Sequence, residues 1–138
     1  MNYCIEEYTT YNEKDILPIY ESVGWTNYTK RPQMLEDAFS NSLKIYAAFV
    51  NDSPVGLIRV VGDGVSVVFI QDLLVRPEYQ RHGIGTALLD KIIKEYENVY
   101  QLHLITDNTE KTVSFYKSLG FHMDTDINCR AFSKYHFG

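Results

Sequence analysis

Six consecutive residues, Gln80-Arg81-His82-Gly83-Ile84-Gly85, have the composition of a loop that binds an anion. They follow an apolar run at residues 67–75 and lead into an amphipathic run at residues 86–96, a pattern that predicts a strand, a turn and a helix. Glycine carries no Cβ, so the backbone at Gly83 and Gly85 can turn sharply and lie close to a ligand. Free N–H groups at a helix start and the positive end of the helix dipole favour phosphate. The segment therefore predicts a diphosphate site.

Two other phosphate-binding loops fit this segment less well. A dinucleotide-binding G-x-G-x-x-G loop counted from Gly83 needs glycine where the chain has Leu88, and a nucleotide P-loop needs a lysine directly after Gly85. A glycine pair that only makes a tight turn is the remaining structural alternative.

The same segment resembles the acetyl-coenzyme A loop, Q/R-x-x-G-x-G/A, of the GNAT superfamily of N-acetyltransferases. Upstream, Leu73-Leu74-Val75-Arg76-Pro77-Glu78-Tyr79 resembles the family's L-x-V-x-P-x-Y approach to the loop. Downstream, Phe115-Tyr116-Lys117-Ser118-Leu119-Gly120-Phe121 resembles its F-Y-x-x-x-G-F signature. The blocks have the order and spacing of the family, so the resemblance is specific for fold and acetyl donor, and it leaves the acceptor open.

The resemblance implies an α/β fold with a mixed, mostly antiparallel sheet, helices on both faces and one splayed pair of parallel strands. The pantetheine arm of acetyl-coenzyme A would lie between those strands, against the end of residues 65–75, with residues 99–106 as the second strand. The diphosphate would rest on the glycine loop. The residues implied to bind the donor are Leu73, Leu74, Val75, Arg81, His82, Gly83, Ile84, Gly85 and Thr86.

The implied reaction is direct attack of a primary amine on the thioester, in a ternary complex. Tyr116 occupies the family's tyrosine position, and a phenol with a reference pKa of about 10 can protonate the departing thiolate at neutral pH. A backbone N–H near Leu74 is the candidate that stabilises the oxyanion. The structural alternative for Tyr116 is a packed aromatic on a helix that already contains Phe115.

Asp72 is the candidate general base, acting directly or through a water, with orientation of a neighbour or of the amine as the alternative role. Strict alternation along the strand places Gln71 and Asp72 on opposite faces. GNAT proteins often have a bulge in this strand, so the sequence leaves open which of the two faces the cleft.

The acceptor side is predicted from the segment between the first two helices, a loop that lines the acceptor in GNAT proteins. It carries Trp25 and Tyr28, and with Gln71 they are the candidate substrate-binding residues; a loop aromatic pinned to the core is the alternative for Trp25. Arg59 is either an anchor for an acidic substrate group or a solvated edge residue. The family's asparagine before the tyrosine falls on Thr109, which leaves a contact between Asn108 and coenzyme A open.

The elements around these residues follow from periodicity, caps and turn residues. The predicted fold is α/β with a mixed sheet, in one domain that covers residues 1–138. The predicted elements are a strand at 3–8, a helix at 12–23 capped by Asn12 and ended by Gly24, a helix from Pro32 to 39, hairpin strands at 43–50 and 55–61, a strand at 65–75, a strand at 99–106, a helix at 110–119 and one or two strands within 121–137.

Composition limits the function further. The chain has 138 residues, 45% of them hydrophobic, and a net charge of −5, with its 13 basic residues scattered, which argues against a nucleic-acid surface. No histidine or cysteine spacing predicts a metal site, and no apolar run is long enough to span a membrane, so we expect no metal, no membrane and a cytoplasmic location. The sequence does not decide the oligomeric state, and a homodimer is possible. The alternative to an enzyme is a non-catalytic module that binds and senses acetyl-coenzyme A.

Overall fold

The structure, a computed structural model, describes residues 1–137 of the chain. The chain divides into two compact units, one of residues 1–104 and one that begins at Ile105, and each is described by itself. The first unit contains a five-stranded sheet with helices packed on it. The second contains the helix α5 (Glu110–Ser118) and the 3₁₀ turn η2 (Asp124–Ile127).

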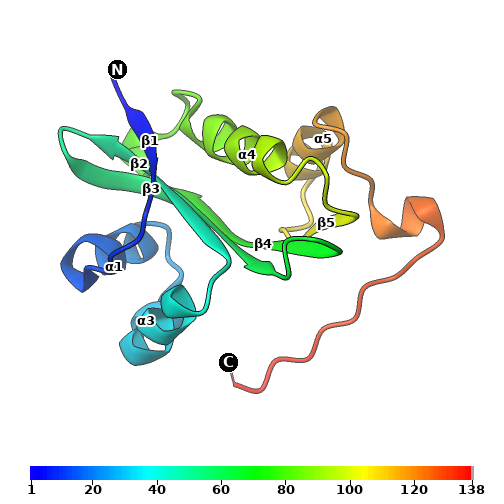
Figure 1. The fold of residues 1–138 in the computed structure, drawn as a ribbon, viewed down its shortest axis with the longest axis horizontal. Coiled ribbons are helices and arrows are strands. Elements are labelled where there is room, and N and C mark those ends of the chain that lie inside the picture. The colour runs from blue at the N-terminus through cyan, green and yellow to red at the C-terminus, as the bar shows by residue number, and fades with distance from the viewer. Residues whose placement is uncertain (138) are drawn as a thin grey trace. The chain divides into compact units, whose positions relative to one another are not determined.

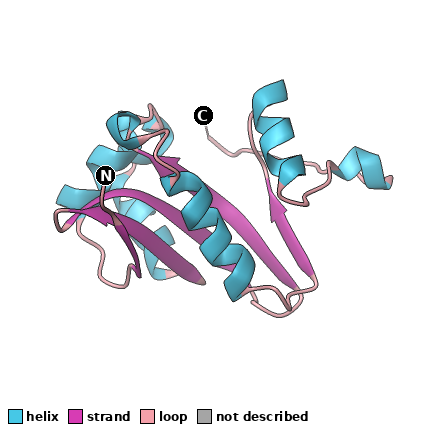
Figure 2. Cartoon of the chain, turned by 90° about the horizontal axis from the view of Figure 1, so that it is seen from above, coloured by secondary structure: helices cyan, strands magenta, loops and turns pink. Residues whose placement is uncertain are grey.

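The sheet is mixed and mostly antiparallel, which confirms the fold class predicted from the sequence (Figures 1 and 2). Three neighbouring strand pairs are antiparallel, and the last pair is parallel. In spatial order the strands are β1 (Cys4–Glu7), β2 (Lys44–Val50), β3 (Ser53–Gly62), β4 (Val67–Val75) and β5 (Gln101–Leu104).

Helices cover both faces of this sheet, with α1 (Glu13–Ser22) and α3 (Pro32–Ser40) on one face and α4 (Ile84–Glu95) on the other (Figure 1). Local chemistry sets their ends as predicted. The Asn12 side chain accepts a hydrogen bond from the Lys14 backbone N–H at 3.1 Å and caps α1. Gly24, at a φ of 77°, follows the end of α1, and Pro32 begins α3.

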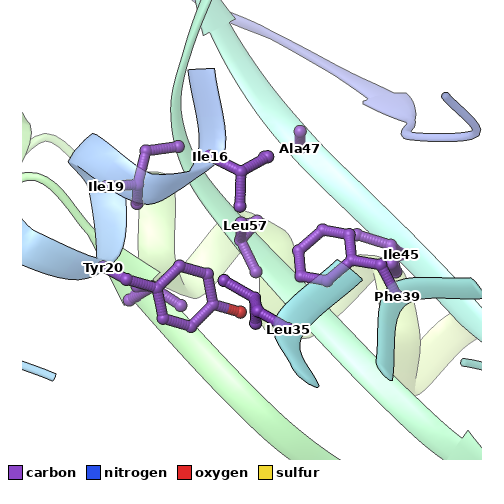
Figure 3. Close-up of a cluster of buried hydrophobic side chains, with 9 residues drawn as sticks. Ile16, Ile19, Tyr20, Leu35, Phe39, Ile45, Ala47 and Leu57 are labelled. Atoms are coloured by element: carbon purple, nitrogen blue, oxygen red, sulfur yellow. The ribbon is translucent and has the colours of Figure 1, made fainter. Parts of the chain in front are cut away.

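The core on the α1 and α3 face is a cluster of buried side chains that joins both helices to the sheet (Figure 3). On the opposite face, α4 buries four apolar side chains at helical spacing. Burying each leucine, isoleucine or phenylalanine side chain of these two sets contributes about 1.5–3 kcal/mol, so apolar packing stabilises β3 and β4 from both faces. The cluster consists of Ile16, Ile19, Tyr20, Leu35, Phe39, Ile45, Ala47, Leu57 and Leu74, and α4 contributes Ile84, Leu88, Leu89 and Ile92.

The β3–β4 ladder contains one bulge, and its position matters for the site. Arg59 pairs with Asp72 and Val60 pairs with Ile70, so Gln71 is an extra residue on β4. Arg59 and Val60 are neighbours on β3, so their side chains point to opposite faces of the sheet. Their partners Asp72 and Ile70 therefore also point to opposite faces. Strict alternation along β4 is broken at Gln71, where the family resemblance allows a bulge.

The structure corrects two of the elements that the sequence predicted. The segment that carries Trp25 and Tyr28 is not a plain loop, because it contains the short helix α2 (Thr26–Thr29). None of the residues of α2 is buried, so it has no apolar period by which the sequence could reveal it. The strand predicted at 99–106 is shorter, and β5 covers only Gln101–Leu104.

The prediction of one or two strands within residues 121–137 is wrong. Among the described residues of this tail the structure contains η2 and no strand. The turn closes with a hydrogen bond of 2.7 Å from the Cys129 N–H to the Asp124 carbonyl. The aromatic residues Phe132, Tyr135 and Phe137 near the end of the tail have β-propensity, but a strand also needs a partner for its backbone groups.

Candidate active site

The end of β4 has an open edge. β4 pairs with β5 only from Val67, opposite Gln101, to Ile70, opposite Leu104. Beyond Ile70, residues 71–75 pair with β3 on one side, and no described residue pairs with them as a strand on the other. The backbone of Leu73, Leu74 and Val75 can therefore accept an extended ligand along this edge, as the resemblance implies.

The loop after β4 is tied to the end of the strand. The Gln80 side-chain N–H donates to the Val75 carbonyl at 2.9 Å, across the 3₁₀ turn η1 (Pro77–Tyr79). Arg81 and Gly83 then have positive φ values of 65° and 81°, and α4 begins at Ile84. No side chain among the described residues caps this helix, so the backbone N–H groups of its first turn are available to an anion.

Gly83 and Gly85 are glycines for different physical reasons. Gly83 lies in the left-handed region, where other residues are strained. Gly85 has an ordinary helical conformation, and a Cβ added there meets only the Val75 Cγ2 atom, at 3.8 Å, an ordinary contact. The protein itself would therefore tolerate a side chain at position 85. Close approach of a ligand to the backbone explains the glycine better than packing does.

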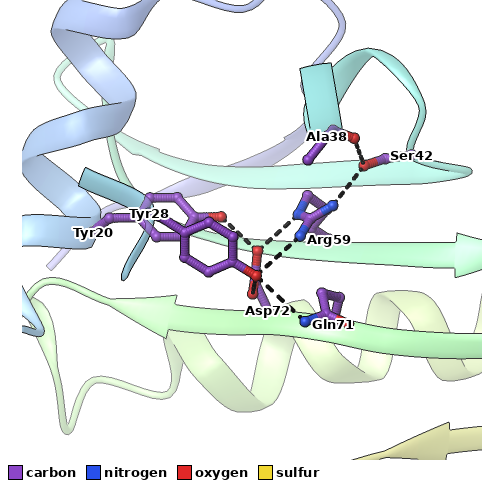
Figure 4. A network of polar contacts seen from close by, with 7 residues as sticks. All are labelled: Tyr20, Tyr28, Ala38, Ser42, Arg59, Gln71 and Asp72. Atoms are coloured by element: carbon purple, nitrogen blue, oxygen red, sulfur yellow. Dashed lines mark hydrogen bonds and ion pairs between the residues drawn. The ribbon is translucent and has the colours of Figure 1, made fainter. Parts of the chain in front are cut away.

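Beside the bulge, a buried ion pair lies between β3 and β4 (Figure 4). Arg59 Nε and Asp72 Oδ2 are 2.7 Å apart, and the two residues are 4% and 1% exposed. The Tyr20 hydroxyl donates to the same Asp72 oxygen at 2.7 Å, and the Tyr28 hydroxyl donates to Oδ1 at 3.3 Å. Both oxygens of Asp72 are therefore engaged within the protein.

Arg59 is neither a substrate anchor nor a solvated edge residue, and both sequence-based alternatives for it are wrong. Its Nη1 donates to Ser42 Oγ at 3.2 Å and its Nη2 to the Tyr28 hydroxyl at 3.4 Å, so all three guanidinium nitrogens have partners. The guanidinium carbon also lies 5.9 Å from the ring centroids of Tyr28 and Phe39. The sequence signal was an arginine and an aspartate in two successive apolar strands, which a hairpin register can bring together.

The bulge brings Gln71 and Asp72 to the same hydroxyl. The Gln71 Nε2 group donates to the Tyr28 hydroxyl at 3.3 Å, while that hydroxyl contacts Asp72. Gln71 is exposed and Tyr28 is half-buried, so the network runs from the core to the surface at this point. Burial, followed by the charge of Asp72, raises the pKa of Tyr28, which stays a phenol at neutral pH.

Trp25 lies next to this group at the start of α2. Its ring is 6.1 Å from the Tyr20 ring, and its side chain is 37% exposed. The Tyr28 ring packs edge-on against Tyr20 at 5.2 Å. The structure thus gathers all three predicted acceptor residues, Trp25, Tyr28 and Gln71, around Tyr20 and Asp72.

Tyr116 lies on α5, in the unit that begins at Ile105. Its ring packs edge-on against Phe115 and Phe121, with centroids 5.1 Å and 5.7 Å away. Burial, followed by the charge of Asp107, raises its pKa, so the phenol keeps its proton at neutral pH. Thr109, at the position of the family's asparagine, caps α5 by accepting a hydrogen bond from the Thr112 N–H at 3.2 Å.

A family model described as an acetyltransferase (GNAT) domain matches residues 7–136. The chain belongs to the GNAT acetyltransferase family. The resemblance noted in the sequence is thereby confirmed, and the general reaction of the family is acetyl transfer from acetyl-coenzyme A. A solved GNAT acetyltransferase from Streptococcus pneumoniae is 43% identical to this chain, with a TM-score of 0.88 over 98% of each chain.

Two further proteins place this GNAT chain among its relatives. An uncharacterized N-acetyltransferase from Gracilaria tenuistipitata is 31% identical over 83% of this chain and 64% of its own length. The PaiA N-acetyltransferase of Thermoplasma acidophilum, solved with coenzyme A, shares the fold at 20% identity and a TM-score of 0.71, over 91% of this chain and 94% of its own. The chain spans 64% and 37% of the length of the first two curated relatives it matches.

The location of this GNAT protein stays a prediction. Within the described residues, no helix has both the length and the apolar character that crossing a membrane requires. Two curated relatives, from Arabidopsis thaliana and Oryza sativa, are described as chloroplastic. The cytoplasmic location expected from the sequence is therefore untested.

Proposed function

We propose that this chain transfers an acetyl group from acetyl-coenzyme A to a primary amine of a small molecule or peptide. The observation that carries the proposal is the continuity of two features: the open edge of Leu73, Leu74 and Val75, and the uncapped start of α4, joined through the hydrogen bond between Gln80 and Val75. A single acetyltransferase domain over residues 1–138 is part of the proposal, and the family match to residues 7–136 supports it.

The donor would bind along this continuous surface. The pantetheine amides pair with the free backbone edge of Leu73, Leu74 and Val75, and the diphosphate accepts N–H groups from the first turn of α4. The exposed Arg81 side chain adds a positive charge for a phosphate. The donor-binding set in this proposal is Leu73, Leu74, Val75, Arg81, His82, Gly83, Ile84, Gly85 and Thr86.

The chemistry needs one bond to form and one to break. The amine nitrogen attacks the thioester carbonyl carbon, the carbonyl oxygen becomes an oxyanion beside the Leu74 backbone N–H, and the carbon–sulfur bond then breaks. Tyr116 gives its proton to the departing sulfur and regains one from solvent before the next turnover. The amine loses one proton in forming the amide.

Asp72 is better suited to orientation than to accepting that proton. It is 1% exposed, and its oxygens already receive hydrogen bonds from Arg59, Tyr20 and Tyr28. A base needs a free lone pair within reach of the amine or of a bridging water. We therefore propose that Asp72 holds the acceptor side in place and that the amine passes its proton to solvent water.

The experiment that tests the proposal measures binding and turnover separately. Calorimetry with acetyl-coenzyme A is expected to give saturable binding that Gly85→Asp abolishes, because the substitution places a side chain and a negative charge where the diphosphate approaches. Gln33→Asp, which adds the same charge in the first turn of α3, is the control and should bind normally.

Turnover is measured as thiol release with a panel of amines, namely phenethylamine, spermidine, lysine ethyl ester and a short peptide with a free N-terminus. Acetyl-dependent thiol release with at least one amine supports the enzyme. Tight donor binding without turnover on any amine would favour the sensing module, and unchanged affinity in a folded Gly85→Asp variant would remove the glycine loop from the donor site.

A further inference from the structure

The hydrogen bonds around Tyr28 have a direction that its two charged neighbours fix. An aspartate carboxylate can only accept hydrogen bonds, and a guanidinium can only donate them. The Tyr28 hydroxyl contacts both, at 3.3 Å from Asp72 Oδ1 and 3.4 Å from Arg59 Nη2. Its single proton therefore points to Asp72, and toward every other neighbour the Tyr28 oxygen acts as an acceptor.

Gln71 is the neighbour whose orientation this decides. A glutamine amide can face a hydroxyl with its oxygen or with its NH₂ group, but a hydroxyl that has already donated its proton accepts only the NH₂ group. The Gln71 Nε2 atom lies 3.3 Å from the Tyr28 oxygen, in agreement with this requirement. The amide oxygen, Oε1, must then point away from Tyr28, and Gln71 is exposed.

From this polarity we infer that Gln71 Oε1 receives an N–H of the acceptor amine, and that Arg59, Asp72 and Tyr28 are positioning residues that aim it. The inference rests on the proposed acetyl transfer and adds the group that holds the acceptor. The bulge in β4 makes this arrangement possible, because it brings Gln71 and Asp72 to the Tyr28 hydroxyl on the same side of the strand.

The arrangement also specifies the class of amine. A neutral primary amine has a lone pair for the attack, one N–H that Gln71 can hold and a second hydrogen to lose as the amide forms. A secondary amine has one hydrogen for both purposes, so its held hydrogen must be released in the reaction. The Arg59–Asp72 pair carries no net charge, so selection here comes from the N–H group and not from attraction of a cation. Gln71 thus favours primary over secondary amines.

The first experiment compares phenethylamine with N-methylphenethylamine in four proteins: the wild type, Gln71→Met, Tyr28→Phe and the double variant. Gln71→Met keeps the length of the side chain, and loss of one hydrogen bond should lower kcat/KM for phenethylamine about 5-fold and reduce the preference for it over the N-methyl compound by a similar factor. Tyr28→Phe should have a smaller effect in the same direction, and the double variant should be no worse than Gln71→Met alone.

Several outcomes decide the inference. Gln33→Met, on the exposed face of α3, is the control and should leave both amines unaffected. The donor KM should stay constant in all variants. Independent, multiplying effects of the two substitutions, or an unchanged preference in Gln71→Met, would overturn the inference. If the wild type turns over normally, either of these results overturns the inference and leaves the proposed function standing. An inactive wild type would count against the proposed function first.

A second measurement does not depend on the acceptor. The Gln71 side-chain NH₂ signals in a ¹⁵N spectrum should be dispersed and rigid in the wild type, and Tyr28→Phe should shift them toward the values of a free amide. The Gln33 signals should stay unchanged in the same variant. Gln71 signals with the same shift and mobility in both proteins would show that Tyr28 does not orient the amide.

Discussion

At the scale of single residues, the most consequential pair is Arg59 and Asp72, because two charges lie where apolar residues would pack. Removing both from water costs several kcal/mol per ion, which their attraction and hydrogen bonds offset. Removing one partner of such a pair costs far more stability than replacing both partners with apolar residues. The pair therefore serves geometry more than stability, since it holds Tyr20, Tyr28 and Ser42 in one arrangement.

This gives a prediction for stability. Asp72→Asn leaves the Arg59 charge buried without its partner and should lower the free energy of unfolding by about 3–5 kcal/mol. The double variant Arg59→Met with Asp72→Leu removes both charges and should lose less than Asp72→Asn alone. Urea denaturation measures these variants together with the single variants Arg59→Met and Asp72→Leu, which complete a double-mutant cycle, and single-site losses that simply add would contradict a coupled pair.

A second prediction concerns Tyr116. Tyr116→Phe keeps the ring packed against Phe115 and Phe121 and removes only the proton, so kcat should fall by about 10²-fold while donor affinity is unchanged. Because burial, followed by the charge of Asp107, raises the pKa of Tyr116, the loss of this proton should lower wild-type kcat only at a higher pH than an exposed tyrosine would require. Tyr135→Phe, at a side chain that is 80% exposed, is the control. Wild-type kcat in Tyr116→Phe would return this tyrosine to a packing role.

At the scale of elements, the sequence predicted those whose ends have their own chemistry. Asn12, Gly24 and Pro32 mark helix ends through local hydrogen bonds and allowed dihedral angles, and the structure has them where they were expected. The family motif likewise predicted the turn into α4, which begins at Ile84. In these cases the neighbours in sequence are also the neighbours in space.

The misses are features that only tertiary pairing decides. The helix α2 buries no residue, so no periodic pattern could signal it. The partners Arg59 and Asp72 meet through the register of a hairpin that a bulge shifts by one residue, and the sequence could not locate that bulge. The aromatic residues near the end of the tail have β-propensity, but propensity does not supply a partner strand.

The third prediction belongs to α2. Trp25 is half of an aromatic contact with Tyr20 and is exposed enough to meet an acceptor. Trp25→Ala should raise the acceptor KM several-fold and lower the free energy of unfolding by about 1 kcal/mol, the usual contribution of an aromatic pair. Trp25→Phe should restore most of the stability. Unchanged acceptor kinetics in Trp25→Ala would mean that α2 only closes the core and that the acceptor enters elsewhere.

At the scale of the whole molecule, buried phenols couple stability to alkaline pH. Burial, followed by the charge of Asp72, raises the pKa of Tyr20 well above 10, and the pKa of Tyr28 is raised for the same reasons. Burial, followed by the charge of Glu13, raises the pKa of Tyr11 to about 12. In each case the folded protein keeps a proton that the unfolded chain loses near pH 10. These groups therefore stabilise the fold fully below pH 10, and their contribution is lost as the pH rises through the folded pKa values.

The fourth prediction follows from that sign. The free energy of unfolding should fall from pH 10 upward, and each such tyrosine should add a slope of about 1.4 kcal/mol per pH unit once it is ionised in the unfolded chain alone. Tyr20→Phe should cost stability at pH 8.5, because the hydrogen bond to Asp72 is lost, and yet make the decline between pH 10 and 11 shallower than in the wild type. Urea denaturation at pH 8.5, 10 and 11 measures both effects, with Tyr100→Phe, at a side chain that is 82% exposed, as the control. Equal slopes in the wild type and Tyr20→Phe would show that Tyr20 does not carry the alkaline sensitivity, and Tyr11 and Tyr28 would then be the groups to examine.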